Sequence, residues 1–243
     1  NHRVKVVIEL PAKVFSKTEA QTHIVLIEKG GKSDETIPIY KADELGSCDD
    51  VVEIHRDSLF NRMDYTFWKW KEAHNYDETQ NLSNHTIDIK RGTATHKQLK
   101  ESGLPYFHTS HFASYPMKVN LLPDETKANS EFRCAREGDI LLARVGKRCI
   151  GKVAIIESGR INISDCVYRI RPPEGMAEYL LDSFLSDKGQ RWFEAHAHGV
   201  CAKVISKRDL LQFPVPSILS VAQKIQRQPD EKAAFARSSI FQE

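Results

Sequence analysis

The stretch that decides the fold is Gly138-Asp139-Ile140-Leu141-Leu142-Ala143-Arg144-Val145-Gly146. Its branched and long apolar residues predict a strand over 139–145, and a second strand of the same kind follows over 150–157. The tripeptide Ser158-Gly159-Arg160 supplies a tight turn into a third strand over 161–170. We therefore expect a three-strand meander at the centre of the protein.

Towards the C-terminus, Pro172-Pro173 ends this meander. Apolar residues at helical spacing then predict one helix from about Met176 to about His196. Residues 209–216 contain two prolines and predict an extended edge segment. Ser217 can cap a final helix, which Pro229 ends or kinks.

Towards the N-terminus, residues 4–10 and 22–28 predict two strands of a hairpin, which are joined by a polar connection and followed by Gly30-Gly31. A polar break at 46–50 precedes an aromatic stretch, so we place a domain boundary near Gly46. Three regions follow, namely 1–46, 47–216 and a C-terminal helical segment over 217–243. A lone hairpin is marginally stable in water, so the first region must pack on other chain. Because Asn1 runs at once into a strand pattern, we expect the sequence to be a piece of a longer protein.

The composition is that of an ordinary globular protein, with 40% apolar and 28% charged residues. Its apolar runs are far shorter than the roughly 20 residues that a membrane helix needs. Val4–Leu10 is interrupted by charges, unlike a signal peptide, so we expect a cytoplasmic protein. The five cysteines form no C-x-x-C pair, which favours reduced thiols over zinc or redox chemistry.

Positive charge is concentrated locally although the net charge is only +2. Residues 132–153 are clearly cationic, and two shorter basic clusters lie at 90–100 and 203–208. Solvated surface charge explains roughly half of such clusters taken singly. Three of them in one chain favour an anionic partner such as nucleic acid.

Three stretches together resemble the target-recognition domains of type I restriction-modification specificity subunits and of fused methyltransferase-specificity proteins. The first is Ile89–Thr95 followed by Gly103–Thr109. The second is Gly138–Gly146 continuing through Gly151–Ala154 to Ile163–Cys166. The third is Phe213–Pro216 leading to Gln223-Lys224-Ile225. Each is weak alone, but their order across about 140 residues makes the set moderately specific.

Two further stretches extend the resemblance over nearly the whole chain. Ile8-Glu9-Leu10-Pro11 with Ile24–Ile27 resembles the closing hairpin of adenine-specific DNA methyltransferases, and Arg62-Met63-Asp64 resembles the opening of many recognition domains. The chain departs from the family in having one recognition unit instead of two and a short terminal helix broken by Pro229. Reading a bipartite site would require a second copy or a second subunit.

The resemblance implies an α+β fold, with a curved mixed sheet and flanking helices that follow a methyltransferase hairpin. It implies sequence-specific recognition of double-stranded DNA for a restriction-modification adenine methyltransferase. The expected partners are DNA and a methyltransferase catalytic domain or subunit, and a restriction subunit is a further candidate. S-adenosylmethionine is expected for the parent protein and not for this region, which lacks the glycine-rich cofactor turn and the N-P-P-Y-type element. We expect no catalytic residue here.

DNA readers hold phosphates with Lys, Arg, Thr and backbone amides while a few side chains reach base edges in the major groove. The candidates near predicted loops or strand ends are Arg91, Thr93, His108, Thr109, Arg144, Lys147, Arg148, Lys152, Lys203 and Lys207. For any one of them, a surface salt bridge or a phosphate contact without sequence information is the outcome in about six cases of ten.

Other chemistries fit the sequence less well. His196, His198 and Cys201, or His108 with His111, lack the paired spacing of a zinc site. Gly31-Lys32-Ser33 is no phosphate-binding loop, because Leu26 stands where that motif needs its first glycine. The aromatic residues at 65–70 could stack bases, yet packing is the commoner use, by roughly three to one.

Two rival functions remain open. One is an assembly module that docks methyltransferase or restriction subunits without reading DNA. The other is the inactive end of a methyltransferase with no specific recognition.

Overall fold

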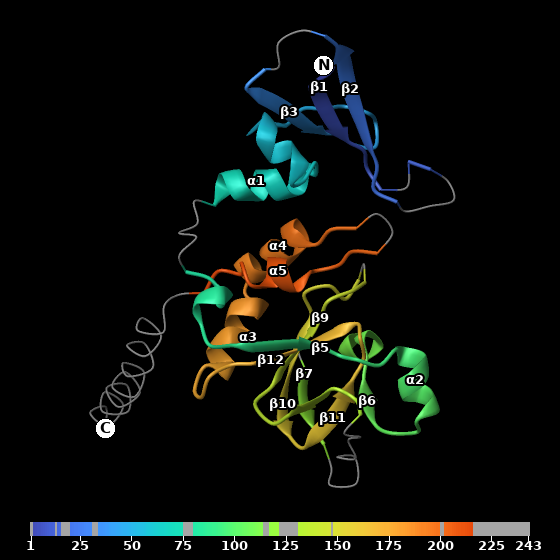
Figure 1. Ribbon diagram of the computed structural model, residues 1–243, viewed down its shortest axis with the longest axis vertical. Helices are drawn as coiled ribbons and strands as arrows, with labels where there is room; N and C mark the ends of the chain where they lie inside the picture. The colour runs from blue at the N-terminus through green and yellow to red at the C-terminus, as the bar shows by residue number, and fades with distance from the viewer. Residues whose placement is uncertain are drawn as a thin grey trace, which may run out of the picture.

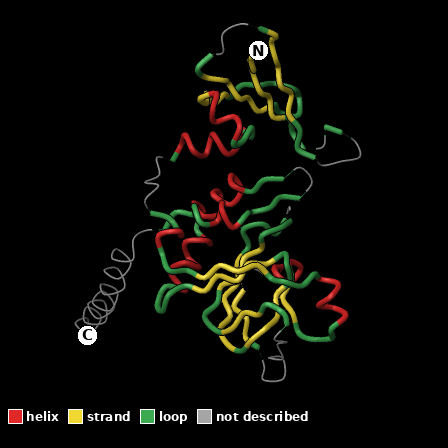
Figure 2. Tube along the Cα trace, viewed as in Figure 1, coloured by secondary structure: helices red, strands yellow, loops and turns green. Residues whose placement is uncertain are grey.

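The computed structural model describes residues 2–12, 14–15, 20–30, 34–74, 80–113, 117–121, 131–146, 148–199 and 202–215. These residues form three sheets with helices between and beside them (Figures 1 and 2). The fold is mixed α+β with open sheets, as the sequence predicts. No helix in these ranges has the length and apolarity of a membrane span. Lys147, Cys201 and the expected helix over 217–243 lie outside the described residues.

The N-terminal sheet has four strands in the order β2-β1-β3-β4. The predicted hairpin is present as β1 (His2–Glu9) and β2 (His23–Lys29), which pair antiparallel. The sheet then continues, because β3 (Thr36–Lys41) pairs parallel to β1, and β4 (Val51–His55) pairs antiparallel to β3. Gly46 therefore lies in a connection within this sheet and not at its end.

A second sheet is mixed and has five strands, in the order β5-β12-β9-β10-β7. Its strands are β5 (Asp88–Arg91), β7 (Met117–Asn120), β9 (Ile140–Ala143), β10 (Val153–Ser158) and β12 (Val167–Arg171). A smaller sheet, β6-β11-β8, comprises β6 (Tyr106–Phe107), β8 (Cys134–Arg136) and β11 (Arg160–Ile163). The sequence predicted one sheet in this region, whereas the structure has two.

Both faces of the central strands are buried, which explains why their sequence is a continuous apolar run. Ile140 and Leu142 pack in one core with the helices, whereas Leu141 and Ala143 pack in a second core with residues of the smaller sheet. The helices on the first face are α3 (Ala177–Leu185), α4 (Asp187–His196) and α5 (Lys207–Leu210). The result is three layers, with the five-stranded sheet in the middle.

The expected meander is wrong in its third strand. The segment over 161–170 splits at Ser164–Cys166 into β11 and β12, which belong to different sheets. The amide of Val167 donates to the carbonyl of Ser164 at 3.0 Å and closes a turn there. β12 consequently pairs with β9, on the side of β9 opposite to β10.

The single helix expected over 176–196 is two helices that meet at Ser186. Its extended backbone (φ −59°, ψ 152°) ends α3, and its hydroxyl accepts from the amide of Gly189 at 3.0 Å to cap α4. Gly189 is needed at this junction, because a Cβ there would lie 2.2 Å from the carbonyl oxygen of Ser183. Of the edge segment expected over 209–216, Asp209 and Leu210 are helical instead, and Pro214 bridges to Asn81.

Helix α1 (Tyr65–Ala73) joins the N-terminal sheet to the rest of the protein (Figure 1). Trp68 packs on the core of the N-terminal sheet. Trp70 packs on the core between the five-stranded sheet and helices α3 and α4. Arg62 strengthens the junction, since its Nε donates to Asp64 Oδ2 at 2.7 Å and its NH1 donates to the carbonyl of His196 at 3.1 Å. Aromatic packing, the commoner use expected from the sequence, is what Trp68 and Trp70 show.

Strand β2 is an edge strand whose aliphatic side chains remain exposed. Ile24, Val25, Leu26 and Ile27 are 51%, 36%, 56% and 55% exposed. A run of adjacent aliphatic residues is typical of strands buried on both faces. In the described residues, this strand has one neighbour, β1, along one of its two edges.

His196 makes the stability of the junction sensitive to acid. Its ring stacks on Trp192 at 3.9 Å, contacts Trp70 and Phe67 edge-on, and donates from Nδ1 to the Trp192 carbonyl at 2.8 Å. Burial lowers the pKa of His196 to about 4. The unfolded chain takes up this proton near its ordinary pKa of about 6.5, so it binds more protons than the folded chain between these two values.

We therefore predict that His196 removes up to about 3 kcal/mol of folding stability as the pH falls from about 7 towards 4. Urea unfolding at a series of pH values measures this loss. His196→Phe keeps an aromatic ring and should show a shallower loss than the wild type, whereas the exposed control His55→Gln should not. An equal acid loss in the wild type and His196→Phe would contradict the prediction.

Candidate nucleic-acid interface

The candidate interface is built around the turn Ser164-Asp165-Cys166, which we call the 164–166 turn. Three strand ends meet it through backbone hydrogen bonds. The amide of Ser164 donates to the carbonyl of Phe107, the last residue of β6, at 3.0 Å, and the amide of Asp165 donates to the carbonyl of Ala94, beyond β5, at 2.8 Å. The amide of Arg144, after β9, donates to the carbonyl of Cys166 at 3.1 Å. Residues far apart in sequence are thereby placed on one rim.

Gly92 allows the loop after β5 to lie against this turn. Its amide donates to the carbonyl of Val167 at 3.1 Å, and a Cβ on Gly92 would lie 2.1 Å from the carbonyl oxygen of Ser164. No side chain fits such a distance without movement of the backbone. The glycine therefore positions its neighbours, Arg91 and Thr93, at the rim.

Two predicted arginines converge on the turn. Arg91 NH2 lies 3.5 Å from Asp165 Oδ2, and the Arg91 side chain is 54% exposed. Arg144 donates from NH1 to the Asp165 carbonyl at 3.2 Å, and its guanidinium lies 5.3 Å from the centre of the Tyr168 ring. Asp165 offsets part of the positive charge and orients both guanidinium groups, while Arg91 stays open to solvent.

The remaining predicted residues of this rim are held by neighbouring loops. Thr93 is exposed, and its hydroxyl accepts from the amide of Arg133 at 3.0 Å. Thr109 opens the short helix η3 (Thr109–Ala113) and hydrogen-bonds the thiol of Cys149, whose pKa is raised by burial. Lys152 Nζ donates to the carbonyl of Phe112 at 3.4 Å, and Arg148 is exposed in the same loop as Cys149.

His108 lies at the rim within a group of rings that the sequence did not indicate as a unit. The ring of His96 stacks on it at 4.2 Å, and the hydroxyl of Ser164 lies 2.8 Å from its Nδ1. Burial lowers the pKa of His108, the rings of His96 and His111 lower it further, and Asp165 raises it. His96 directly follows Thr95, the N-cap of α2, and nothing in its sequence context indicates that its ring stacks on His108. The stack exists only after folding.

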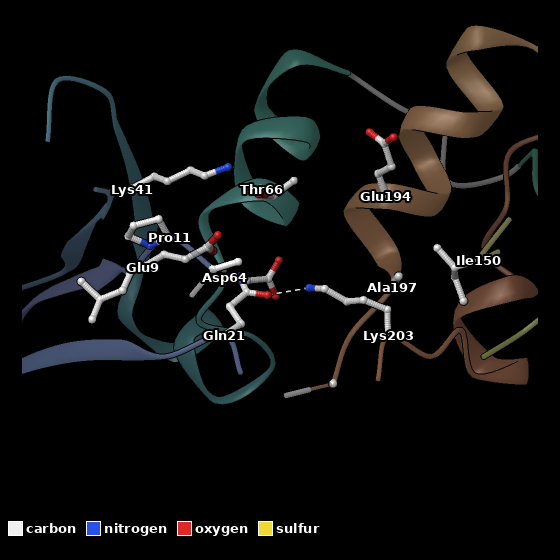
Figure 3. Close-up of a pocket in the computed structure, with 13 residues that line it drawn as sticks. Glu9, Pro11, Gln21, Lys41, Asp64, Thr66, Ile150, Glu194, Ala197 and Lys203 are labelled. Atoms are coloured by element: carbon white, nitrogen blue, oxygen red, sulfur yellow. Dashed lines mark hydrogen bonds between the residues drawn. The ribbon is translucent and has the colours of Figure 1, made fainter. Parts of the chain in front are cut away.

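Two predicted residues lie elsewhere. Lys203 lines a cavity of about 330 Å³ between the N-terminal sheet and α4, and its Nζ donates to Gln21 Oε1 at 2.5 Å (Figure 3). Burial lowers the pKa of Lys203. Lys207 is the exposed first residue of α5, away from the strand ends that meet the 164–166 turn.

Glu9 contributes to the same cavity from the N-terminal sheet. Its side chain is only 3% exposed, and its Oε2 accepts the amide of Tyr65 at 2.7 Å. Asp64 and Lys41 also line this space (Figure 3). Within the described residues, no group of three His, Cys, Asp or Glu side chains could hold a metal ion.

No known family model matches this sequence, and no curated protein is similar to it. Solved structures to which this chain is similar include the type IIG restriction endonuclease BpuSI, at 13% identity and a TM-score of 0.43 over 89% of this chain and 37% of that one. The HsdS subunit from Thermoanaerobacter tengcongensis is 17% identical, with a TM-score of 0.39 over 65% of this chain and 38% of the other.

A third similar structure is the S subunit of a type I restriction-modification system from M. genitalium, which is 15% identical with a TM-score of 0.36. That match covers 54% of this chain and 32% of the M. genitalium chain. The present chain thus spans less than two fifths of the length of each of these three proteins.

The contact between Gly92 and Ser164 yields a prediction. Gly92→Ala should lower the free energy of unfolding by about 2 kcal/mol or more, because the methyl group overlaps a backbone carbonyl. Gly103→Ala is the matched control, since its φ is +66° and nothing lies within 4 Å of a Cβ there, so only left-handed strain of about 1 kcal/mol is expected. Urea unfolding compares the two, and equal losses would contradict the prediction.

Proposed function

We propose that this chain recognises the sequence of double-stranded DNA for a restriction-modification adenine methyltransferase and acts in the cytoplasm. The observation that carries the proposal is the convergence of Arg91, Arg144 and His108 on the 164–166 turn from three different strand ends. Loops at strand ends, held by a buried sheet, are well suited to place side chains against a duplex.

The chemistry of adenine methylation explains why such a part is needed. A methyltransferase must swing its target adenine out of the helix, and its pocket then identifies little beyond that base. Flanking bases must be read by a separate surface, through phosphate contacts that set the register and a few contacts to base edges. Arg91 is the side chain of the rim best placed for a two-pronged contact to guanine, because it is exposed and its planar group is oriented by Asp165.

The motifs quoted from the sequence support the same proposal. In it, residues 1–46 supply the tail of a methyltransferase fold, and methyl transfer from S-adenosylmethionine belongs to a catalytic domain elsewhere in the protein or in a partner subunit. The present residues supply recognition and no catalytic group. A restriction subunit is a further partner in this proposal.

An assembly function is the second candidate, and the exposed aliphatic run on β2 favours it. Ile24–Ile27 offer an open strand edge together with apolar side chains on both faces. Such a strand fits the sheet of a methyltransferase domain, which would cover it. This docking role needs no DNA contact at the 164–166 turn, so the two candidates can be separated by experiment.

The test is selection from a library of DNA duplexes at several salt concentrations. Sequence recognition predicts an enriched motif and an affinity that falls steeply with salt, because bound phosphates release counterions. Docking alone predicts neither. Absence of any enriched motif, with weak retention at every salt concentration, would overturn the proposal.

Single substitutions locate the interface. Arg91→Ala and Arg148→Ala should each weaken binding, and loss of a phosphate contact should reduce the slope of log affinity against log salt by about 1. A base contact by Arg91 would instead relax the selected motif at one position, at a cost of about 1 to 3 kcal/mol. The control is Arg56→Ala, in the short helix after β4. Unchanged motif, slope and affinity in both rim variants would contradict the assignment.

A further inference from the structure

Three histidines and a tyrosine gather beside the 164–166 turn from separate elements. His96 is the first residue of α2 (His96–Glu101), Tyr106 belongs to β6, His108 follows β6, and His111 lies in η3. The rings of His96 and His108 are nearly parallel, at an interplanar angle of 5°, and His96 Nε2 lies 3.0 Å from the Tyr106 hydroxyl. His96 and His111 are exposed, whereas His108 is half-buried.

His108 has a hydroxyl partner at each ring nitrogen. Ser164 Oγ lies 2.8 Å from Nδ1, and Thr109 Oγ1 lies 3.3 Å from Nε2. A hydroxyl can donate to a bare ring nitrogen or accept from a protonated one. Both the neutral ring and the imidazolium of His108 are therefore hydrogen-bonded in the same geometry.

His111 differs from His108 in this respect. Its Nδ1 accepts the backbone amide of His108 at 2.9 Å, so its ring proton sits on Nε2. A second proton on His111 would break that hydrogen bond. Of these two histidines, His108 is therefore the one that can change its charge without loss of a contact.

The charges around His108 determine when it takes up a proton. Asp165 is the acidic group facing it from the turn, and Asp165 is shared with Arg91 of β5 and Arg144 after β9. On α2, Lys97 is paired with Glu101 at 3.8 Å. Burial, His96 and His111 keep the pKa of His108 below its ordinary value, so its ring is neutral near pH 7 in the free protein.

We propose that His108, with His96 stacked on it, takes up one proton from solvent when a phosphate of duplex DNA docks at the 164–166 turn. This inference rests on the proposed DNA recognition and adds proton linkage to it. The ligand is a phosphodiester oxygen, which stays anionic, and no covalent bond changes. Ser164 and Thr109 hold the imidazolium once it has formed.

The sign of the pH dependence follows from the two states. Docking of an anion raises the pKa of His108. At pH values between the pKa of the free protein and that of the complex, the complex therefore holds more protons than the free protein. Affinity rises as the pH falls through this interval and levels off below the free value. The steepest slope for one proton is about tenfold per pH unit.

The experiment measures the dissociation constant of the duplex enriched by the library selection, from about pH 8 to pH 5.5 at constant ionic strength. We expect affinity to rise several-fold on acidification in the wild type and to be nearly flat in His108→Gln. The control is His85→Gln, a partly buried histidine whose pKa is also lowered by burial and which precedes β5, away from the turn. This control should keep the wild-type slope.

A second measurement needs no substitution. Nuclear magnetic resonance of the wild-type imidazole groups, with and without the duplex, should show the titration of His108 moving to higher pH on binding. A wild-type slope retained in His108→Gln, or an unmoved titration of His108, overturns the inference while DNA recognition stands. Failure to retain any duplex at any pH instead overturns the proposed function and the inference with it.

Discussion

The contact between the backbone of Gly92 and the carbonyl of Ser164 is the constraint on which the candidate interface depends. A hypothetical Cβ at 2.1 Å shows how closely the loop after β5 approaches the turn between β11 and β12. This approach lets Asp165 hydrogen-bond Ala94 and brings Arg91 within 3.5 Å of the Asp165 carboxylate. If the loop moved outward by the width of a methyl group, Arg91 and Thr93 would leave the rim that Arg144 and His108 occupy. The packing of the backbone therefore determines which charged side chains the candidate interface can contain.

A second constraint holds the N-terminal sheet to helix α4 and the five-stranded sheet that it covers. Arg62 donates to Asp64, which caps α1 by accepting from Phe67, and it also donates to the last carbonyls of α4. A guanidinium at the C-terminal end of a helix is favourable because the free carbonyls there carry partial negative charge. Acidification threatens this junction, since His196, the last residue of α4, would have to become charged while stacked on Trp192. The motif Arg62-Met63-Asp64 thus contributes to the joint between the two regions.

The elements predictable from sequence are those whose pattern is local. The strands near 140–143 and 153–158 and the hairpin of β1 and β2 follow from runs of branched apolar residues. The splits at Ser164 and Ser186 could not be foreseen, because hydrogen bonds to Phe107 and a close approach at Gly189 produce them. Of the candidate site, the cationic loops were predictable from charge counting. The burial of Lys203 against Gln21 and the stack of His96 on His108 were not, because each joins residues from separate elements.

The same distinction separates the buried residues that build the scaffold of the candidate interface from the exposed side chains on its surface. Asp139, in the stretch that decides the fold, is 1% exposed and accepts two hydrogen bonds from Arg171 at 2.7 Å and one from the amide of Arg136 at 2.9 Å. It ties the start of β9 to the end of β12 and is too buried to contact DNA. Two glycines likewise have a backbone role. Gly138 adopts a positive φ, and Gly92 allows the close contact with Ser164. Motifs made of such residues identify the scaffold, whereas in the proposed function the bases read depend on exposed side chains such as Arg91 and Arg148. Under the proposed function, two proteins with these motifs can therefore share one fold and recognise different DNA sequences.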